Sequence, residues 1–157
     1  MKNLRTVALC ASITVFSLCA SAQTGNIPIN EPNYNKPSMF SSLPDNIPVD
    51  LTAVNGLFGS FVGTNISISL SPTVVFRIDG QVVSQVNKYD NQIQSVVLRS
   101  TNYDGARLTI SKLTDASGTV TYTGRILSMG HGDLFELKDV AGQLYFVKRK
   151  FNDMIAE

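Results

Sequence analysis

The sequence lacks tryptophan, has one histidine, and carries both of its cysteines within the first 19 residues. These residues have the features of a secretion signal. Lys2 and Arg5 form a basic start, an apolar stretch follows, and Ala20-Ser21-Ala22 offers a small-residue cleavage site before Gln23. We therefore predict a signal peptide over residues 1–22 and an extracytoplasmic location, secreted or periplasmic. Cleavage would remove both thiols, so we expect a mature chain without disulfides.

An uncleaved membrane anchor is the alternative for this segment. Its apolar stretch, residues 6–22, has 17 residues, which is the lower limit for spanning a bilayer, and it contains three serines and two threonines. The basic start and the Ala-Ser-Ala ending favour cleavage. Cys10 and Cys19 each follow a leucine, whereas a lipoprotein anchor needs a small residue at that place. We expect no membrane association after cleavage.

The sequence has little excess charge of either sign. Without Lys2 and Arg5 it keeps 11 basic and 12 acidic residues, a net charge of −1. A near-neutral chain has no electrostatic footprint for nucleic acid, so we predict no nucleic-acid partner. Lys148-Arg149-Lys150 is the one basic cluster, and on an expected late strand it is typical of edge protection.

The predicted mature chain contains few residues of the types that carry out catalysis or bind metals. A serine hydrolase would need His131 as its base, but His131 lies between two glycines in an expected turn, and no G-x-S-x-G elbow occurs. Zinc sites draw on cysteine and histidine, and Gly130-His131-Gly132-Asp133 has too few acids for a calcium loop. We assign no catalytic, metal-binding or cofactor-binding residue, and we predict a protein that is not an enzyme and has no cofactor.

Turns account for half of the twelve acidic residues, because aspartate in a turn hydrogen-bonds its own backbone. These aspartates are Asp79, Asp90, Asp104, Asp115, Asp133 and Asp139. We therefore expect no glycosidase pair of carboxylates. Tyr89 and Tyr103 lie near turns, but tyrosines at strand ends are more typical of the rim of a core than of a sugar-stacking site.

Residues 23–49 differ in composition from the rest of the chain. Five of the six prolines and five asparagines fall there. Proline removes backbone donors and asparagine favours turns, so we predict an extended or disordered arm. Two interpretations stay open: a flexible leader, or a binding arm that packs against a partner or its own domain.

Residues 50–157 are predicted to form a single antiparallel β-domain. Asp50 is a suitable N-cap for a short helix within residues 50–63, although Gly56 and Gly59 weaken a helix there. From Asn65 onward apolar residues recur with a period of two, which indicates about seven or eight half-buried strands joined by short turns. This pattern predicts a mainly β fold, either a barrel or a sandwich.

Two dipeptides in this domain predict two-residue hairpins. They are Asp79-Gly80, with a return strand from Gln81 to about Tyr89, and Ala141-Gly142. Gly124, on the inward side of an alternating segment, suggests a bend or bulge. The residues that we expect to face inward are Phe76, Val96, Leu98, Leu108, Ile110, Tyr122, Ile126 and Phe146.

These features predict an exported, non-catalytic β-domain that binds another protein, as an inhibitor-like or envelope accessory module. The contact would involve residues 23–49 or a sheet edge, since strands and extended arms both add to a partner's sheet or groove. The alternative is a small barrel that holds an apolar ligand, and a hydrolase comes third. Bulky inward residues favour a filled core over a ligand cavity.

Overall fold

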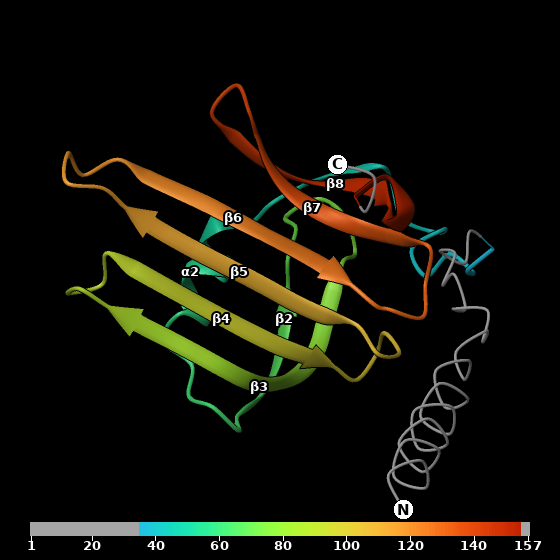
Figure 1. Cartoon of the computed structure of the whole chain (residues 1–157), viewed down its shortest axis with the longest axis horizontal. Helices are drawn as coiled ribbons and strands as arrows, with labels where there is room; N and C mark the ends of the chain where they lie inside the picture. Colours follow the sequence, from blue (N-terminus) through green and yellow to red (C-terminus); the bar gives the residue numbers. More distant parts are fainter. Residues whose placement is uncertain (1–34, 155–157) are drawn as a thin grey trace, which may run out of the picture. The chain divides into compact units, whose positions relative to one another are not determined.

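The computed structural model describes residues 35–154, which form one eight-stranded antiparallel sheet, a short α-helix and a terminal 3₁₀-helix (Figure 1). The predicted signal peptide and the first part of the predicted arm lie outside these residues. The elements are β1 (Asn46–Pro48), α2 (Leu51–Leu57), β2 (Asn65–Ser69), β3 (Arg77–Lys88), β4 (Ile93–Ser100), β5 (Arg107–Thr114), β6 (Val120–Leu127), β7 (Asp133–Val140), β8 (Gln143–Lys150) and η1 (Phe151–Met154).

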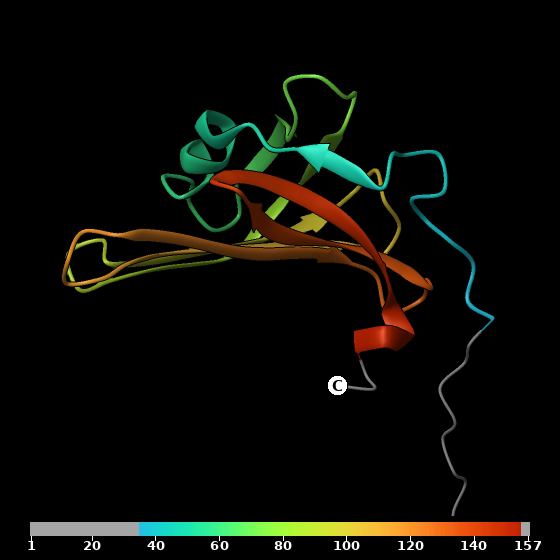
Figure 2. The same ribbon diagram turned by 90° about the horizontal axis from the view of Figure 1, so that it is seen from above.

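The sheet follows the chain order from β2 to β8 and adds β1 beside β8, giving β1-β8-β7-β6-β5-β4-β3-β2. It curls into a half-barrel, and α2 and β1 lie on one side of the layer formed by β3–β6 (Figure 2). One hydrogen bond joins the two ends of the sheet, from the Asp50 N–H to the Leu70 carbonyl at 3.0 Å. The mainly β, antiparallel prediction with one short helix is confirmed. Residues 35–154 contain no cysteine, so this domain has no disulfide.

Aromatic side chains fill the concave face of the sheet. Phe40, Phe76, Phe135 and Phe146 are each fully buried, and Phe135 contacts the other three with ring centroids 5.0, 5.3 and 6.5 Å away. Burying a phenylalanine contributes about 1.5–3 kcal/mol, so this cluster is a large part of the folding energy. Seven of the eight residues predicted to face inward are buried, and Tyr122 is half-buried.

Helix α2 begins where the sequence predicts. The Asp50 carboxylate accepts hydrogen bonds from the Thr52 and Ala53 N–H groups at 2.9 and 3.1 Å, which caps the first turn. The buried Val54 and Leu57 face the core. The helix ends after Leu57, earlier than residue 63, because the glycines near its end do not sustain it. No helix among residues 35–154 is long and apolar enough to cross a membrane.

The second part of the predicted arm, residues 35–49, belongs to this sheet and core. Strand β1 pairs with β8 through Asn46, Ile47 and Pro48, and Ile47 is fully buried. Phe40 contacts the rings of Phe76, Tyr103 and Phe135 in the aromatic cluster. These contacts fix residues 35–49 on their own domain.

The prediction of a hairpin at Asp79-Gly80 is wrong. Both residues lie inside β3, paired with β2 on one side, and Gly80 is also paired with Ser100 of β4. The chain reverses earlier, between Leu70 and Phe76, where the Leu70 N–H donates to the Phe76 carbonyl at 2.8 Å. A close approach explains the glycine: a Cβ on Gly80 would lie 2.4 Å from the Arg99 carbonyl oxygen.

The Ala141-Gly142 hairpin is confirmed. Both residues have positive φ, 54° and 83°, as a type I′ turn requires, and they join β7 to β8 between Val140 and Gln143. The Asp139 carboxylate accepts a hydrogen bond from the Gly142 N–H at 2.8 Å. The turn therefore uses its aspartate as the sequence predicts.

Candidate functional site

Asp133, at the start of β7, holds residues 38–40 against the sheet. Its carboxylate accepts hydrogen bonds from the Ser38 hydroxyl and from the Met39 and Phe40 N–H groups, the last two at 2.6 and 2.8 Å. Asp133 is 7% exposed, so this is a buried charge that three donors stabilise. Its role in the described structure is to anchor Phe40 in the core, which no turn signal in the sequence indicates.

A glycine next to Asp133 permits this docking. The Gly132 N–H donates to the Pro37 carbonyl at 2.9 Å, and a Cβ on Gly132 would lie 2.8 Å from the Lys36 carbonyl oxygen. A hollow of about 580 Å³ opens beside this contact. Its lining residues are Lys36, Ser38, Asp45, Gly132, Asp133, Lys148, Arg149, Lys150, Asn152 and Asp153.

The basic cluster at residues 148–150 is partly used inside the protein. The Lys148 ammonium donates to the Leu43 carbonyl at 2.5 Å and pairs with Asp45 at 3.2 Å. Arg149 lies 3.7 Å from Glu136 on the neighbouring strand. Acidic side chains line the same hollow and offset its positive charge. The hollow therefore lacks the uniform positive charge that favours binding of an anion.

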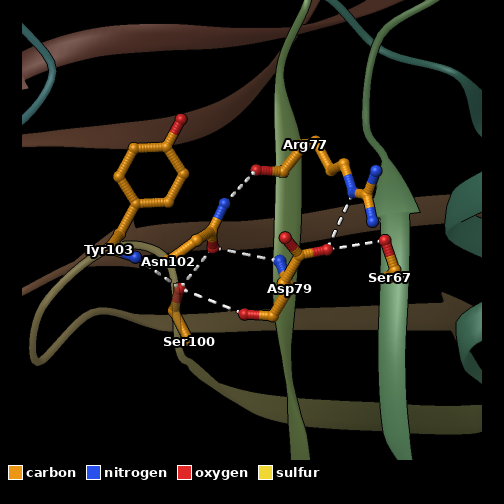
Figure 3. A network of polar contacts seen from close by, with 6 residues as sticks. All are labelled: Ser67, Arg77, Asp79, Ser100, Asn102 and Tyr103. Atoms are coloured by element: carbon orange, nitrogen blue, oxygen red, sulfur yellow. Dashed lines mark hydrogen bonds and ion pairs between the residues drawn. The ribbon is translucent and has the colours of Figure 1, made fainter.

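A second polar group surrounds Asp79 on β3 (Figure 3). The Asn102 side chain accepts a hydrogen bond from the Asp79 N–H at 3.0 Å and donates one to the Arg77 carbonyl at 2.9 Å. Because β4 ends at Ser100, this side chain takes the place of backbone partners for β3. Ser100 donates to the Asn102 side chain and accepts from the Tyr103 N–H. This network supports the β4–β5 turn against β3.

The Asp79 carboxylate forms one ion pair and accepts two side-chain hydrogen bonds. Ser67 donates to it at 2.6 Å and the Arg77 guanidinium at 2.8 Å. The Ser67 hydrogen bond, followed by that from Arg77, holds the pKa of Asp79 below its ordinary value of 3.8. A carboxylate with a lowered pKa is a poor general acid at neutral pH.

Replacing Ser67 with alanine is expected to raise the pKa of Asp79 toward 3.8, because the largest cause of its depression is removed. The pairing stabilises the fold above the ordinary pKa, and this contribution is lost as pH falls through the lowered one. NMR titration of the carboxyl carbon measures the change. Ser95→Ala is the control, since that hydroxyl bonds Ser111 instead. An unchanged Asp79 pKa in Ser67→Ala would contradict the assignment.

His131 contacts a serine, as a hydrolase base would, but the serine is inaccessible. The His131 Nδ1 lies 3.0 Å from the Ser128 hydroxyl in the same turn, and Ser128 is only 3% exposed. The nearest acid along the chain, Asp133, is engaged with residues 38–40. In residues 35–154 no group of three or more histidine, aspartate and glutamate side chains is arranged to hold a metal ion.

The most distinctive feature of the sheet is the incomplete pairing between β6 and β7. Strands β5 and β6 pair along eight residues, and so do β7 and β8, but β6 and β7 pair only at Arg125–Glu136, Ile126–Phe135 and Leu127–Leu134. Beyond this point the two strands diverge (Figure 1). A groove of about 490 Å³ lies along the divergence. This β6–β7 groove is lined by Thr109, Ser111, Thr121, Tyr122, Thr123, Gly124, Arg125, Glu136, Leu137, Lys138 and Asp139.

Backbone groups of β6 point into this groove. In an antiparallel ladder, alternate residues direct their N–H and C=O groups to opposite neighbours. The Asp115 N–H donates to the Thr119 carbonyl at 3.0 Å, which directs the odd-numbered residues of β6 to β5. The same alternation directs the backbone groups of Val120, Tyr122 and Gly124 toward β7. Val120 and Tyr122 have no partner residue there, and Gly124 flanks the last pair, Arg125–Glu136.

Strand β7, the opposite wall of the groove, also directs backbone groups toward it. Val140 and Gln143 flank the two-residue turn and pair across it, so even-numbered residues of β7 face β8. The backbone groups of Leu137 and Asp139 are therefore directed toward β6. Leu137 flanks the Arg125–Glu136 pair, and Asp139 has no partner residue on β6. On the concave side, the Tyr122 hydroxyl donates to the Asn55 side chain of α2 at 2.9 Å, which closes the groove from within.

Comparison with known proteins gives no relative: no protein-family model, no curated protein and no solved structure matches this chain.

Proposed function

We propose that this protein is an exported, non-catalytic β-domain that binds a partner protein by adding an extended segment of the partner to the open edge of β6. The incomplete pairing of β6 with β7 carries the proposal. A strand edge with unpaired N–H and C=O groups is a ready template for another chain. Export rests on the sequence of residues 1–22.

The other contact surfaces foreseen in the sequence are less available. Residues 35–49 of the predicted arm are held by Asp133, by β8 and by the aromatic cluster. Edge strand β1 has three residues and ends in Pro48, a common protection against strand addition. At the other edge of the sheet, the residue that follows β2, Leu70, accepts a hydrogen bond from the Asp50 N–H, so this end of β2 is partly covered. These observations favour the β6 edge.

The β6 edge also has suitable chemistry for strand addition. Val120, Thr121, Tyr122 and Thr123 are β-branched or aromatic, which favours strands. The groove closes at the Arg125–Glu136 pair and opens toward the hairpin tips, so a segment added to β6 lies between two strands of the same sheet. It therefore suits one extended peptide better than the edge of a folded domain.

Two observations weigh against the alternatives. The four phenylalanines occupy the concave face, where a ligand-binding barrel would keep a cavity. The polar groups that hydrolysis needs are engaged: Asp79 with Arg77, Asp133 with three donors, and Ser128 below the surface. Both support a binding role.

Peptides selected from a random display library test the proposal. We expect them to protect the Val120, Tyr122 and Gly124 amides from hydrogen exchange. Tyr122→Pro removes an N–H on the groove side without removing a β5–β6 hydrogen bond, so it should abolish binding. Tyr122→Ala is the matched control, because it removes the same side chain and keeps the N–H.

Circular dichroism and thermal unfolding establish that both Tyr122 variants fold. If Tyr122→Pro folds and binds the selected peptides as tightly as Tyr122→Ala does, strand addition at β6 is refuted. Protection of amides elsewhere in the sheet, with none at β6, would refute it too.

A further inference from the structure

Three arginines form a row on the outer face of the sheet, next to the closed end of the β6–β7 groove. Arg99 of β4 is directly opposite Arg107 of β5. Arg125 of β6 is opposite Thr109, two residues from Arg107 on the same face. Directly opposite side chains lie about 4.5–5.5 Å apart at Cβ and diagonal ones about 7–8 Å, so the three guanidinium groups share one surface.

This arginine row has no counter-charge of its own. All three side chains are exposed, and among residues 35–154 none of them forms an ion pair. Glu136, the residue opposite Arg125, is occupied by Lys138 at 2.7 Å and Arg149 at 3.7 Å. Like charges directly opposite in a sheet are unfavourable, so the row is suited to an anionic partner.

The groove connects geometrically to the row. A segment paired with β6 along Val120–Gly124 meets the β6–β7 ladder at Arg125 and must leave the plane of the sheet there. On the inner face, Ile126 and Phe135 are fully buried in the core and block its path. On the outer face it passes Arg125 and then Arg107.

We infer that the partner segment is an acidic peptide: a neutral strand that adds to β6, followed at the closed end of the groove by carboxylates that bind Arg125, Arg107 and Arg99. The inference rests on the proposed strand addition at β6. Arginine suits this task because its planar guanidinium binds carboxylates with two parallel hydrogen bonds. Charge complementarity then sets which extended segments the open edge accepts.

Synthetic peptides test this inference directly. The probes are a six-residue strand of alternating valine and threonine with three glutamates at its N-terminus, and the same strand with the glutamates at its C-terminus. Control peptides carry glutamine or lysine in place of glutamate. Of the two acidic peptides, we expect the one that binds more tightly to have an affinity at least about tenfold higher than its glutamine counterpart at low salt. This difference in affinity should fall as the salt concentration is raised.

Substitutions of the arginine row supply the second arm. Arg99→Gln, Arg107→Gln and Arg125→Gln should each weaken the acidic peptide about two- to fivefold, the size that an exposed ion pair contributes. Lys88→Gln is the matched control, since it removes one exposed positive charge at the far end of β3. Thermal unfolding should show that the arginine variants stay folded.

The outcomes separate this inference from the proposed function. Equal binding of glutamate, glutamine and lysine peptides, with the Tyr122 and Gly124 amides protected, would overturn the acidic partner and leave strand addition intact. Acidic peptides that depend on the arginines but leave those amides unprotected would overturn the inference, because the row would then bind anions without the groove. Absence of binding by every peptide would also overturn it, whereas the library selection tests strand addition separately.

Discussion

Replacing Asp133 with alanine is expected to lower the free energy of unfolding by about 3–5 kcal/mol. The carboxylate accepts from the Ser38 hydroxyl and from the Met39 and Phe40 N–H groups. Alanine would leave the buried donor at Phe40 without a partner and would loosen that ring in the aromatic cluster. Urea unfolding, followed by far-UV circular dichroism, measures the loss.

Asp153→Ala is the matched control for this effect. Asp153 lines the same hollow but is exposed, and exposed substitutions of this kind change stability by within about 0.5 kcal/mol. Ser38→Ala removes one of the three donors and should give an intermediate loss. Similar losses in Asp133→Ala and Asp153→Ala would show that the anchor contributes little.

The second large effect is expected at Gly80. Gly80→Ala should destabilise the protein by about 2–3 kcal/mol, because its Cβ would meet the Arg99 carbonyl oxygen at 2.4 Å and the backbone must shift. The strain falls between β3 and β4, since Gly80 pairs with Ser100 there. Thermal unfolding measures the cost, and faster amide exchange at residues 99–101 would locate it.

Gly56→Ala should have the opposite sign. Gly56 lies in α2 with no atom within 4 Å of the position of its Cβ, so alanine adds helix propensity without a clash. The gain should be up to about 1 kcal/mol. A Gly80→Ala protein as stable as Gly56→Ala would refute the close-approach explanation.

The period-two pattern predicted the strands well because each strand buries one face and exposes the other. Val120, Tyr122, Gly124 and Ile126 lie on one side of β6, as their alternation indicates. The predicted bulge at Gly124 is absent, because the β5–β6 register continues unbroken through Ile110–Gly124. A close approach explains this glycine instead, since a Cβ there would lie 2.8 Å from the Thr109 carbonyl oxygen. Asp50 likewise caps a helix through contacts only two and three residues away.

The misassigned turn at Asp79-Gly80 has a physical explanation. The same dipeptide that favours a type I′ turn also suits a strand crossed closely by a neighbour, because glycine has no Cβ. Whether Asp79-Gly80 forms a turn or lies within a strand depends on the contact with Arg99, nineteen residues further along the chain. The residues next to Gly80 in the sequence do not indicate that contact. Ala141-Gly142, with no such neighbour, forms the expected hairpin.

The candidate site was only partly foreseen. A sheet edge was expected as a contact surface, but the sequence of β6 and β7 did not indicate that their pairing would stop after three residue pairs. The arginine row was equally hidden, since residues 99, 107 and 125 are far apart in the chain and become neighbours only through strand register. A near-neutral net charge concealed a local cluster of one sign.

The sequence alone determined the strand content, the helix cap, most inward-facing residues and the prediction of an exported chain without thiols. These properties depend on neighbours within a few residues, where periodicity, capping and turn chemistry act. Only the tertiary structure decided that Asp133 anchors residues 38–40, that β6 keeps an open edge and that three arginines share a surface. Each of these joins segments distant in the chain, because a sheet's curl and register set which residues meet.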